Sequence, residues 1–240
     1  MKILALDSSA TVASVALCED ERLLAEYTLN NGNTHSETLL PMVEALLSHF
    51  GISVDDVDLF AASTGPGSFT GVRIGTATLK GLAFAKNRPC VGVSTLEALA
   101  ENAVSIGGLI CPVMNARRSQ VYTALFRSDG AMLTRLLPDS ALSISELDEL
   151  LAAFGEPVIF VGDGEKITRD ALVKTTAYPI SNRLCHQSAY SVAQVARKAY
   201  ESGLAVSDSA LAVTYLRPSQ AERERLEREK SNENPVNQQN

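Results

Sequence analysis

Residues 1–29, MKILALDSSATVASVALCEDERLLAEYTL, decide the fold. This stretch contains short apolar segments at Ile3–Leu6, Val12–Leu17 and Leu23–Thr28, separated by turn-prone polar residues. Short apolar runs joined by such turns are typical of a β-meander. We therefore predict that the chain begins with three consecutive strands.

The residues that follow alternate between helical and extended patterns. Leu39, Val43, Leu46 and Phe50 recur at helical spacing, which predicts a helix that ends before Gly51. Thr34 and Glu37 predict a capping box at its start, and Ser94 with Glu97 predicts another cap farther along. The expected elements are helix 36–50, strand Val57–Ala62, turn Thr64–Ser68, helix Phe69–Lys86, strand Pro89–Val93 and a helix after Ser94.

The first hundred residues thus follow the order βββαβα, and a second, abbreviated round begins near Leu109. Its expected elements are strands Leu109–Met114 and Val121–Phe126, helix Ser145–Ala153, strand Val158–Val161 and helix Ala189–Tyr200. We expect an α/β protein with a first lobe at 1–105 and a smaller lobe at 106–218. The helix near 189–201 is expected to pack back on the first lobe, and the polar residues 219–240 are expected to be disordered.

Composition limits the classes of function. The chain has 240 residues, a net charge of −7 and a pI near 5.1, so we expect any contact with RNA to be indirect, since phosphate binding favours basic faces. Its apolar runs are too short to span a bilayer, and because strand-like sequence begins at Ile3, we expect no signal peptide. The four cysteines are scattered, and the three histidines form no H-E-x-x-H motif, so we expect neither disulfides nor a metal site. We therefore expect a cytoplasmic location.

Two glycine- or serine-rich turns are candidate phosphate sites. Asp7-Ser8-Ser9 follows the first predicted strand, where backbone N–H groups could hold a phosphate and Asp7 could lie near magnesium. An ordinary polar turn explains the same residues. The stretch TGPGSFTGVR at 64–73 precedes a helix that could attract anions, yet a structural turn accounts for it equally well. The residues of this possible vestigial nucleotide site are Asp7, Ser8, Ser9, Gly65, Gly67, Gly162 and Gly164.

Helix 69–86 is apolar around most of its circumference and must be covered on more than one side. It is either enclosed within this chain or covered by a partner subunit. The preceding helix carries a second, mildly apolar stripe, and two such helices could form half of an intersubunit four-helix bundle. The expected partner-binding residues are Thr38, Met42, Ala45, His49, Val72, Gly75, Thr76 and Leu79.

No constellation in the sequence predicts nucleophilic catalysis. His35 stands at a helix entrance, where a surface or capping role is usual. Cys185 and His186 are adjacent and so are poorly placed for base activation, and no G-x-S-x-G elbow is present. Arg117-Arg118 could bind an anion or form a solvated turn. We therefore predict no catalytic residues.

Several motifs together resemble the TsaB (YeaZ) family. They are MKILALDSS at 1–9, HSE at 35–37, TGPGSFTGVRIG at 64–75, NARR at 115–118 and YLRPSQAE at 215–222. The resemblance implies an actin-like ATPase fold of the ribonuclease H-like class, with two lobes. It also implies a non-catalytic subunit that binds the transferase TsaD, which forms N6-threonylcarbamoyladenosine beside the anticodon of tRNA.

The resemblance carries further expectations about partners. A TsaE-like ATPase would join the complex, and ATP with magnesium would act there rather than on this chain alone. The isolated chain would form a homodimer. TsaD proteins carry an H-x-x-x-H metal pair, whereas the matching positions here are Thr95 and Leu99, and leucine cannot bind a metal.

The sequence departs from the family at one position, and two other classes of protein are alternatives. Asn115 stands where the family commonly has Asp, which weakens any cation or nucleotide site at that turn. A small actin-like kinase would use the Asp7 turn for phosphate and a carboxylate as general base, but no clear base follows residues 64–73. A peptidase lacks any credible nucleophile with its base.

Overall fold

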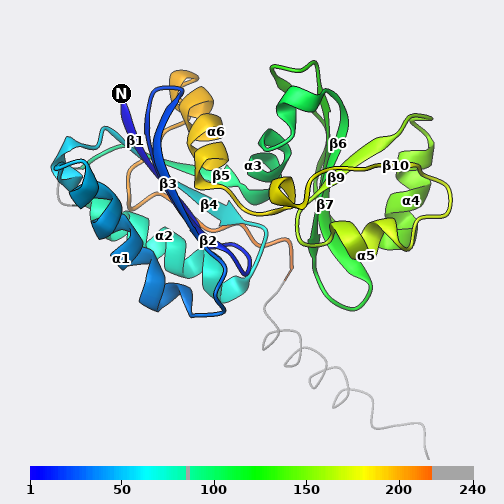
Figure 1. The fold of residues 1–240 in the computed structure, drawn as a ribbon, viewed down its shortest axis with the longest axis horizontal. Helices are drawn as coiled ribbons and strands as arrows, with labels where there is room; N and C mark the ends of the chain where they lie inside the picture. The colour runs from blue at the N-terminus through cyan, green and yellow to red at the C-terminus, as the bar shows by residue number, and fades with distance from the viewer. Residues whose placement is uncertain (85–86, 218–240) are drawn as a thin grey trace, which may run out of the picture.

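The computed structural model describes residues 1–84 and 87–217, which form two five-stranded sheets (Figure 1). The first sheet has the order β3-β2-β1-β4-β5. Its first three strands form the expected antiparallel meander, and β4 and β5 add in parallel. The strands are β1 (Lys2–Asp7), β2 (Ala13–Glu19), β3 (Arg22–Leu29), β4 (Leu59–Gly65) and β5 (Cys90–Ser94).

Helices cover both faces of this sheet. On one face lie α1 (His35–His49) and α2 (Phe69–Phe84), whose side chains Leu39, Leu46 and Leu79 are fully buried. Each such side chain contributes about 1.5–3 kcal/mol by leaving water. The other face is covered by α6 (Ala189–Glu201), which supplies small residues to a second core.

The second sheet repeats the topology of the first. Read in reverse, its strand order is β8-β7-β6-β9-β10, which corresponds strand by strand to β3-β2-β1-β4-β5 of the first sheet. The duplicated topology confirms the predicted two-lobed actin-like fold. The elements are β6 (Gly108–Asn115), β7 (Gln120–Ser128), β8 (Leu133–Ser143), α4 (Ile144–Ala152), β9 (Val158–Val161), α5 (Glu165–Arg169) and β10 (Ala177–Tyr178).

Strand β8 was absent from the sequence expectations, so the second round is less abbreviated than predicted. It is an edge strand of 11 residues, and none of them is fully buried. Pro138 lies within it, and proline is confined to edge strands because it cannot donate to the ladder. Without a buried face, β8 has no regular alternation to reveal it.

Helix α3 (Thr95–Glu101) lies between the two sheets. Ala98 packs in the core of the first sheet, whereas Leu96 and Leu99 pack in the core of the second. The cap expected from Ser94 is confirmed, since the backbone N–H of Glu97 donates to Ser94 Oγ at 3.3 Å. One short helix therefore connects both lobes.

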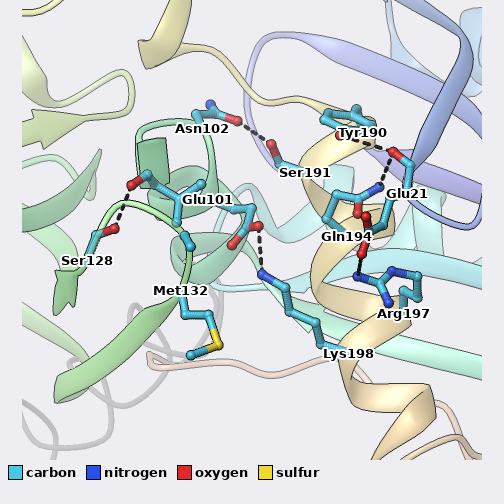
Figure 2. A network of polar contacts seen from close by, with 12 residues as sticks. Glu21, Glu101, Asn102, Ser128, Met132, Tyr190, Ser191, Gln194, Arg197 and Lys198 are labelled. Atoms are coloured by element: carbon cyan, nitrogen blue, oxygen red, sulfur yellow. Dashed lines mark hydrogen bonds and ion pairs between the residues drawn. The ribbon is translucent and has the colours of Figure 1, made fainter. Parts of the chain in front are cut away.

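Polar contacts fix α6 against the first sheet and α3, although α6 follows the second sheet in sequence (Figure 2). Lys198 Nζ lies 2.8 Å from Glu101 Oε1, and Ser191 Oγ donates to Asn102 Oδ1 at 2.7 Å. At the other side of the helix, Arg197 donates to Glu21 Oε1 at 2.8 Å. These contacts join the end of α3 to the β2–β3 turn through α6.

Two expectations about helix ends have different outcomes. The capping box at α1 was wrong, because the Thr34 side chain makes no cap hydrogen bond and its hydroxyl lies 3.2 Å from Ser36 Oγ instead. Helix α2 was expected to reach Lys86, which lies outside the described residues, as does the tail from 219. In the described part of the chain, no helix combines the length and apolar character needed to cross a bilayer.

Candidate functional site

A cleft of about 840 Å³ lies between the two lobes. Its walls are the turn after β1, the loop before α2, the β6–β7 hairpin and the segment that precedes residue 218. The lining side chains that carry charge are Arg117, Asp163 and Arg217. The cleft is large enough for a small ligand.

Asp7 does not reach this cleft. Its carboxylate is buried and accepts hydrogen bonds from Ser63 Oγ at 2.5 Å, Ser9 Oγ at 2.6 Å and the Ser9 backbone N–H at 2.9 Å. Burial raises the pKa of Asp7, and these hydrogen bonds oppose that shift. Both oxygens of this buried carboxylate accept hydrogen bonds from Ser9 or Ser63, so in this structure the side chain holds together the turn after β1.

Glycines of α2 and of the loop before it make room for the same turn. A Cβ at Gly67 would lie 2.4 Å from the backbone oxygen of Ser9, and one at Gly71 would lie 2.1 Å from that of Ser8. One at Gly75 would lie 2.4 Å from Ser8 Oγ. These glycines therefore allow the helix to lie directly against the chain after β1. Their spacing reflects packing within the chain.

The remaining glycines of the expected nucleotide site are also packing residues. A Cβ at Gly65 would lie 2.4 Å from the backbone oxygen of Thr214, and one at Gly162 would lie 2.2 Å from that of Val113. Gly164 donates its N–H to the same Val113 oxygen at 3.0 Å. Of the seven residues expected at this site, Ser9 and Gly67 line the cleft.

The hairpin between β6 and β7 has an unusual backbone. Arg117, Arg118 and Ser119 all have positive φ, at 63°, 53° and 55°. The turn is held by the Asn115 side chain, whose Oδ1 accepts from the Arg117 N–H at 2.8 Å, while the Asn115 N–H donates to Asp163 Oδ1 at 3.0 Å. Three successive left-handed residues are rare outside glycine. From this hairpin, Arg117 lines the cleft.

Arg73, Tyr215 and Arg217 were not predicted as site residues, although all three lie in the family motifs. Tyr215 stacks on Phe69 with ring centroids 4.7 Å apart, and the Arg73 guanidinium lies 3.9 Å from the Phe69 centroid. Arg73 Nε donates to the Tyr215 hydroxyl at 2.6 Å. The motif spacing could not reveal this cluster, because its members meet only in the folded chain.

Six of the eight residues expected to bind a partner are buried within the chain. A rigid partner cannot contact these side chains, so the expectation needs correction: Ala45 and His49 are exposed, whereas Thr38, Met42, Val72, Gly75, Thr76 and Leu79 are not. The open face of α2 is instead formed by Arg73, Ala77, Gly81 and Phe84, and that of α1 by Leu40, Pro41, Glu44, Ala45 and Ser48.

The positions that match the TsaD histidine pair are also enclosed. Thr95 is fully buried and Leu99 is 1% exposed, both on α3 between the sheets. Neither side chain can supply the imidazole nitrogen that the motif requires. Among the described residues, no group of three or more His, Cys, Asp or Glu side chains could hold a metal ion.

Comparison with known proteins gives consistent results. The family model for TsaD, described as tRNA N6-adenosine threonylcarbamoyltransferase, matches residues 22–232. The tRNA threonylcarbamoyladenosine biosynthesis protein TsaB of Bacillus subtilis (strain 168) is 37% identical over 162 residues, which cover 68% of this chain and 71% of that protein. TsaB of Escherichia coli (strain K12) is 39% identical over 131 residues, or 54% of this chain and 56% of that protein.

A solved structure covers more of the chain. YeaZ from Pseudomonas aeruginosa superposes with a TM-score of 0.76 at 28% identity, over 90% of this chain and 99% of that one. The alignments and the duplicated sheets agree with the motifs at both ends of the sequence. The chain therefore belongs to the family that the TsaD model describes and, within it, to the TsaB (YeaZ) proteins.

Proposed function

We propose that this chain is a non-catalytic subunit in the formation of N6-threonylcarbamoyladenosine in tRNA, where it binds and supports a TsaD-like transferase. The names of the TsaB relatives and of the matching family model support the pathway. A TsaE-like ATPase would complete the assembly, and ATP and magnesium would act there. The tRNA would be contacted indirectly, the chain alone would form a homodimer, and its location would be cytoplasmic.

The state of Asp7 carries the proposal. In an actin-like ATPase the carboxylate after the first strand must be free to act near magnesium. Here it is buried and bound to Ser9 and Ser63, and the space beside the neighbouring glycines is filled by backbone. The positions of the histidine pair hold Thr95 and Leu99. These observations favour a binding role over phosphoryl or acyl transfer.

The outer face of α1 and α2 is the surface that we assign to the partner. The two helices pack side by side over the first sheet (Figure 1). Ala77 and Gly81 are exposed positions with small or no side chains in the second half of α2, and Phe84 at its end is 75% exposed. Small residues flanked by an exposed aromatic side chain suit the close approach of a partner helix. In an isolated chain this face would be covered by a second copy.

The test introduces a charge on this face without disturbing the fold. Gly81 is exposed, and a Cβ added there would meet no atom within 4 Å, so Gly81→Arg should fold normally. We expect Gly81→Arg to abolish co-elution with the TsaD-like paralogue in size-exclusion chromatography. Leu150→Arg, on an exposed position of α4 in the other lobe, is the matched control. Binding that survives Gly81→Arg while circular dichroism shows a native fold would refute the assigned surface.

A second measurement separates this proposal from a kinase. We expect the isolated chain to show no turnover of ATP in the presence of magnesium, because Asp7 is buried and both of its carboxylate oxygens accept hydrogen bonds within the chain. Turnover of ATP by the chain alone, lost in Asp7→Asn, would overturn the non-catalytic role. A chain that neither turns over ATP nor binds a TsaD-like protein would overturn the partner role as well.

A further inference from the structure

The last described segment crosses from one lobe to the other. We call residues 211–217 the C-terminal strap; it follows α6 and leads into the space between the two sheets (Figure 1). Four of its residues, Thr214 to Arg217, line the interlobe cleft. The strap is thus one wall of the cleft, and its contacts decide how the two lobes are joined on that side.

The strap is firmly attached to the first lobe. Leu211 is 4% exposed and packs in the core of the first sheet, where its Cδ1 lies 3.0 Å from the position that a Cβ at Gly92 would take. Thr214 donates its N–H to the Thr64 oxygen at 2.8 Å. Gly65 lets the Thr214 backbone approach, because a Cβ there would lie 2.4 Å from the Thr214 oxygen. The strap is thus held to β4 by a backbone hydrogen bond and to the first core by Leu211.

Within residues 1–84 and 87–217, the Arg217 side chain attaches the strap to the second lobe. Arg217 Nη2 donates to Gln120 Oε1, and Arg217 Nη1 donates to the Ala116 oxygen at 3.5 Å. Its guanidinium lies 5.7 Å from the centroid of the Tyr122 ring. All three partners belong to the β6–β7 hairpin and its strands. Arg217 is therefore a point contact between the strap and the hairpin that carries Arg117.

The opposite side of the molecule is joined by different contacts. Asn102, at the end of α3, accepts from Ser191 (Figure 2). It also donates to the backbone oxygens of Leu184 at 3.0 Å and His186 at 2.8 Å. These bonds join the end of α3 to the segment 184–191, which leads from the second sheet into α6. Two lobes joined along one side can rotate about it unless a second contact crosses the cleft.

We propose that the C-terminal strap is a latch that holds the two lobes at a fixed opening, with Arg217 as its contact to the second lobe. The inference rests on the proposed function in one respect: a chain that serves as a docking subunit loses less conformational entropy on binding if its lobes are already fixed. The latch itself is a property of the isolated chain and is tested without any partner.

The test measures the separation of the lobes directly. Spin labels are attached to cysteines introduced by Asn30→Cys and Leu150→Cys, exposed positions in the first and second lobes. The four native cysteines are buried, so they should not react with the label. Double electron–electron resonance of full-length chain, diluted with unlabelled protein, then gives the distribution of distances. We expect one narrow distribution, which becomes broader and shifts when Arg217→Ala is added.

Matched variants make each outcome decisive. Gln120→Ala removes the acceptor while keeping Arg217, and it should broaden the distribution in the same way. Arg22→Ala removes an arginine whose ion pair with Glu19 lies within one exposed turn, and it should have no effect. A native circular dichroism spectrum is required of each variant. An unchanged distribution in both Arg217→Ala and Gln120→Ala would overturn the latch, whether or not the chain binds a TsaD-like protein.

Discussion

At the scale of the residue, Asp7 shows how burial changes the meaning of a motif. An aspartate after the first strand of an actin-like fold suggests magnesium, yet this one satisfies two hydroxyl groups and one backbone N–H. Charged groups incur a large desolvation cost in such a position, and the raised pKa of Asp7 expresses that cost. The residue stabilises the turn on which α2 rests.

Asp7→Asn and Asp7→Ala separate these roles. Asparagine keeps an acceptor for Ser9 and can pair with Ser63, so we expect a loss below about 1 kcal/mol in the free energy of unfolding. Alanine leaves buried donors without acceptors and should cost about 2–4 kcal/mol, since each unsatisfied group costs about 1–3 kcal/mol. Urea unfolding at neutral pH measures both values.

The pH dependence gives an independent check on Asp7. Because its pKa is raised in the folded state, the proton is bound more tightly there than in the unfolded chain. Its contribution to stability is full below the unfolded pKa of about 4 and is lost as pH rises through the folded pKa. The stability of wild type relative to Asp7→Asn should therefore fall with rising pH. A relative stability that rises instead would contradict the assigned shift.

At the scale of the element, α2 has two kinds of glycine. Gly71 faces inward against the Ser8 backbone, whereas Gly81 faces outward with open space around it. Gly75 belongs to the inward set, so a charge placed there would disrupt folding rather than association. This corrects the expectation that Gly75 lies at the partner surface. The same residue type thus serves close packing on one face and leaves the other face free.

Replacing each glycine by alanine should have opposite effects. In Gly81→Ala the new methyl group meets nothing, and the helix gains about 0.5–1 kcal/mol from reduced backbone entropy in the unfolded chain. In Gly71→Ala the Cβ would lie 2.1 Å from the Ser8 oxygen, so the helix must shift and stability must fall. Thermal unfolding of the two variants compares them directly. Equal effects would mean that α2 does not rest on the Ser8 turn.

At the scale of the whole molecule, the two lobes share α3 and are joined on both sides of the cleft. Ala98 packs with the first sheet, and Leu96 and Leu99 pack with the second. The strap and the Asn102 hydrogen bonds add further contacts between segments distant in sequence. A shared helix couples the stability of one lobe to that of the other, so the chain should unfold as one unit.

Leu99→Ala tests this coupling. The side chain is 1% exposed, and its truncation should cost about 2–5 kcal/mol by creating a cavity in the second core. We expect calorimetry to show a single transition at a lower temperature, because α3 cannot leave one core without disturbing the other. Leu150→Ala, at a side chain 43% exposed, should change little. A second transition that appears only in Leu99→Ala would show that the lobes unfold independently.

Local pattern in the sequence determined most of the elements of this protein. Short apolar segments separated by turn residues in residues 1–29 predicted the meander, helical spacing predicted α1, and the repeated order of elements predicted two lobes. These features are local, because a strand or helix reveals its buried face through the period of its own residues. Strand β8 was not predicted, because an edge strand without a buried face has no such period.

Only the tertiary structure decided what the motifs do. Whether Asp7 faces solvent depends on Ser63, and whether Gly65 binds a ligand depends on Thr214, which are distant in the sequence. The apolar circumference of α2 left its open face undetermined until α1 and the Ser8 turn covered the rest. Contacts of this kind follow from how elements pack, and the periodicity of a single element carries no information about its neighbours.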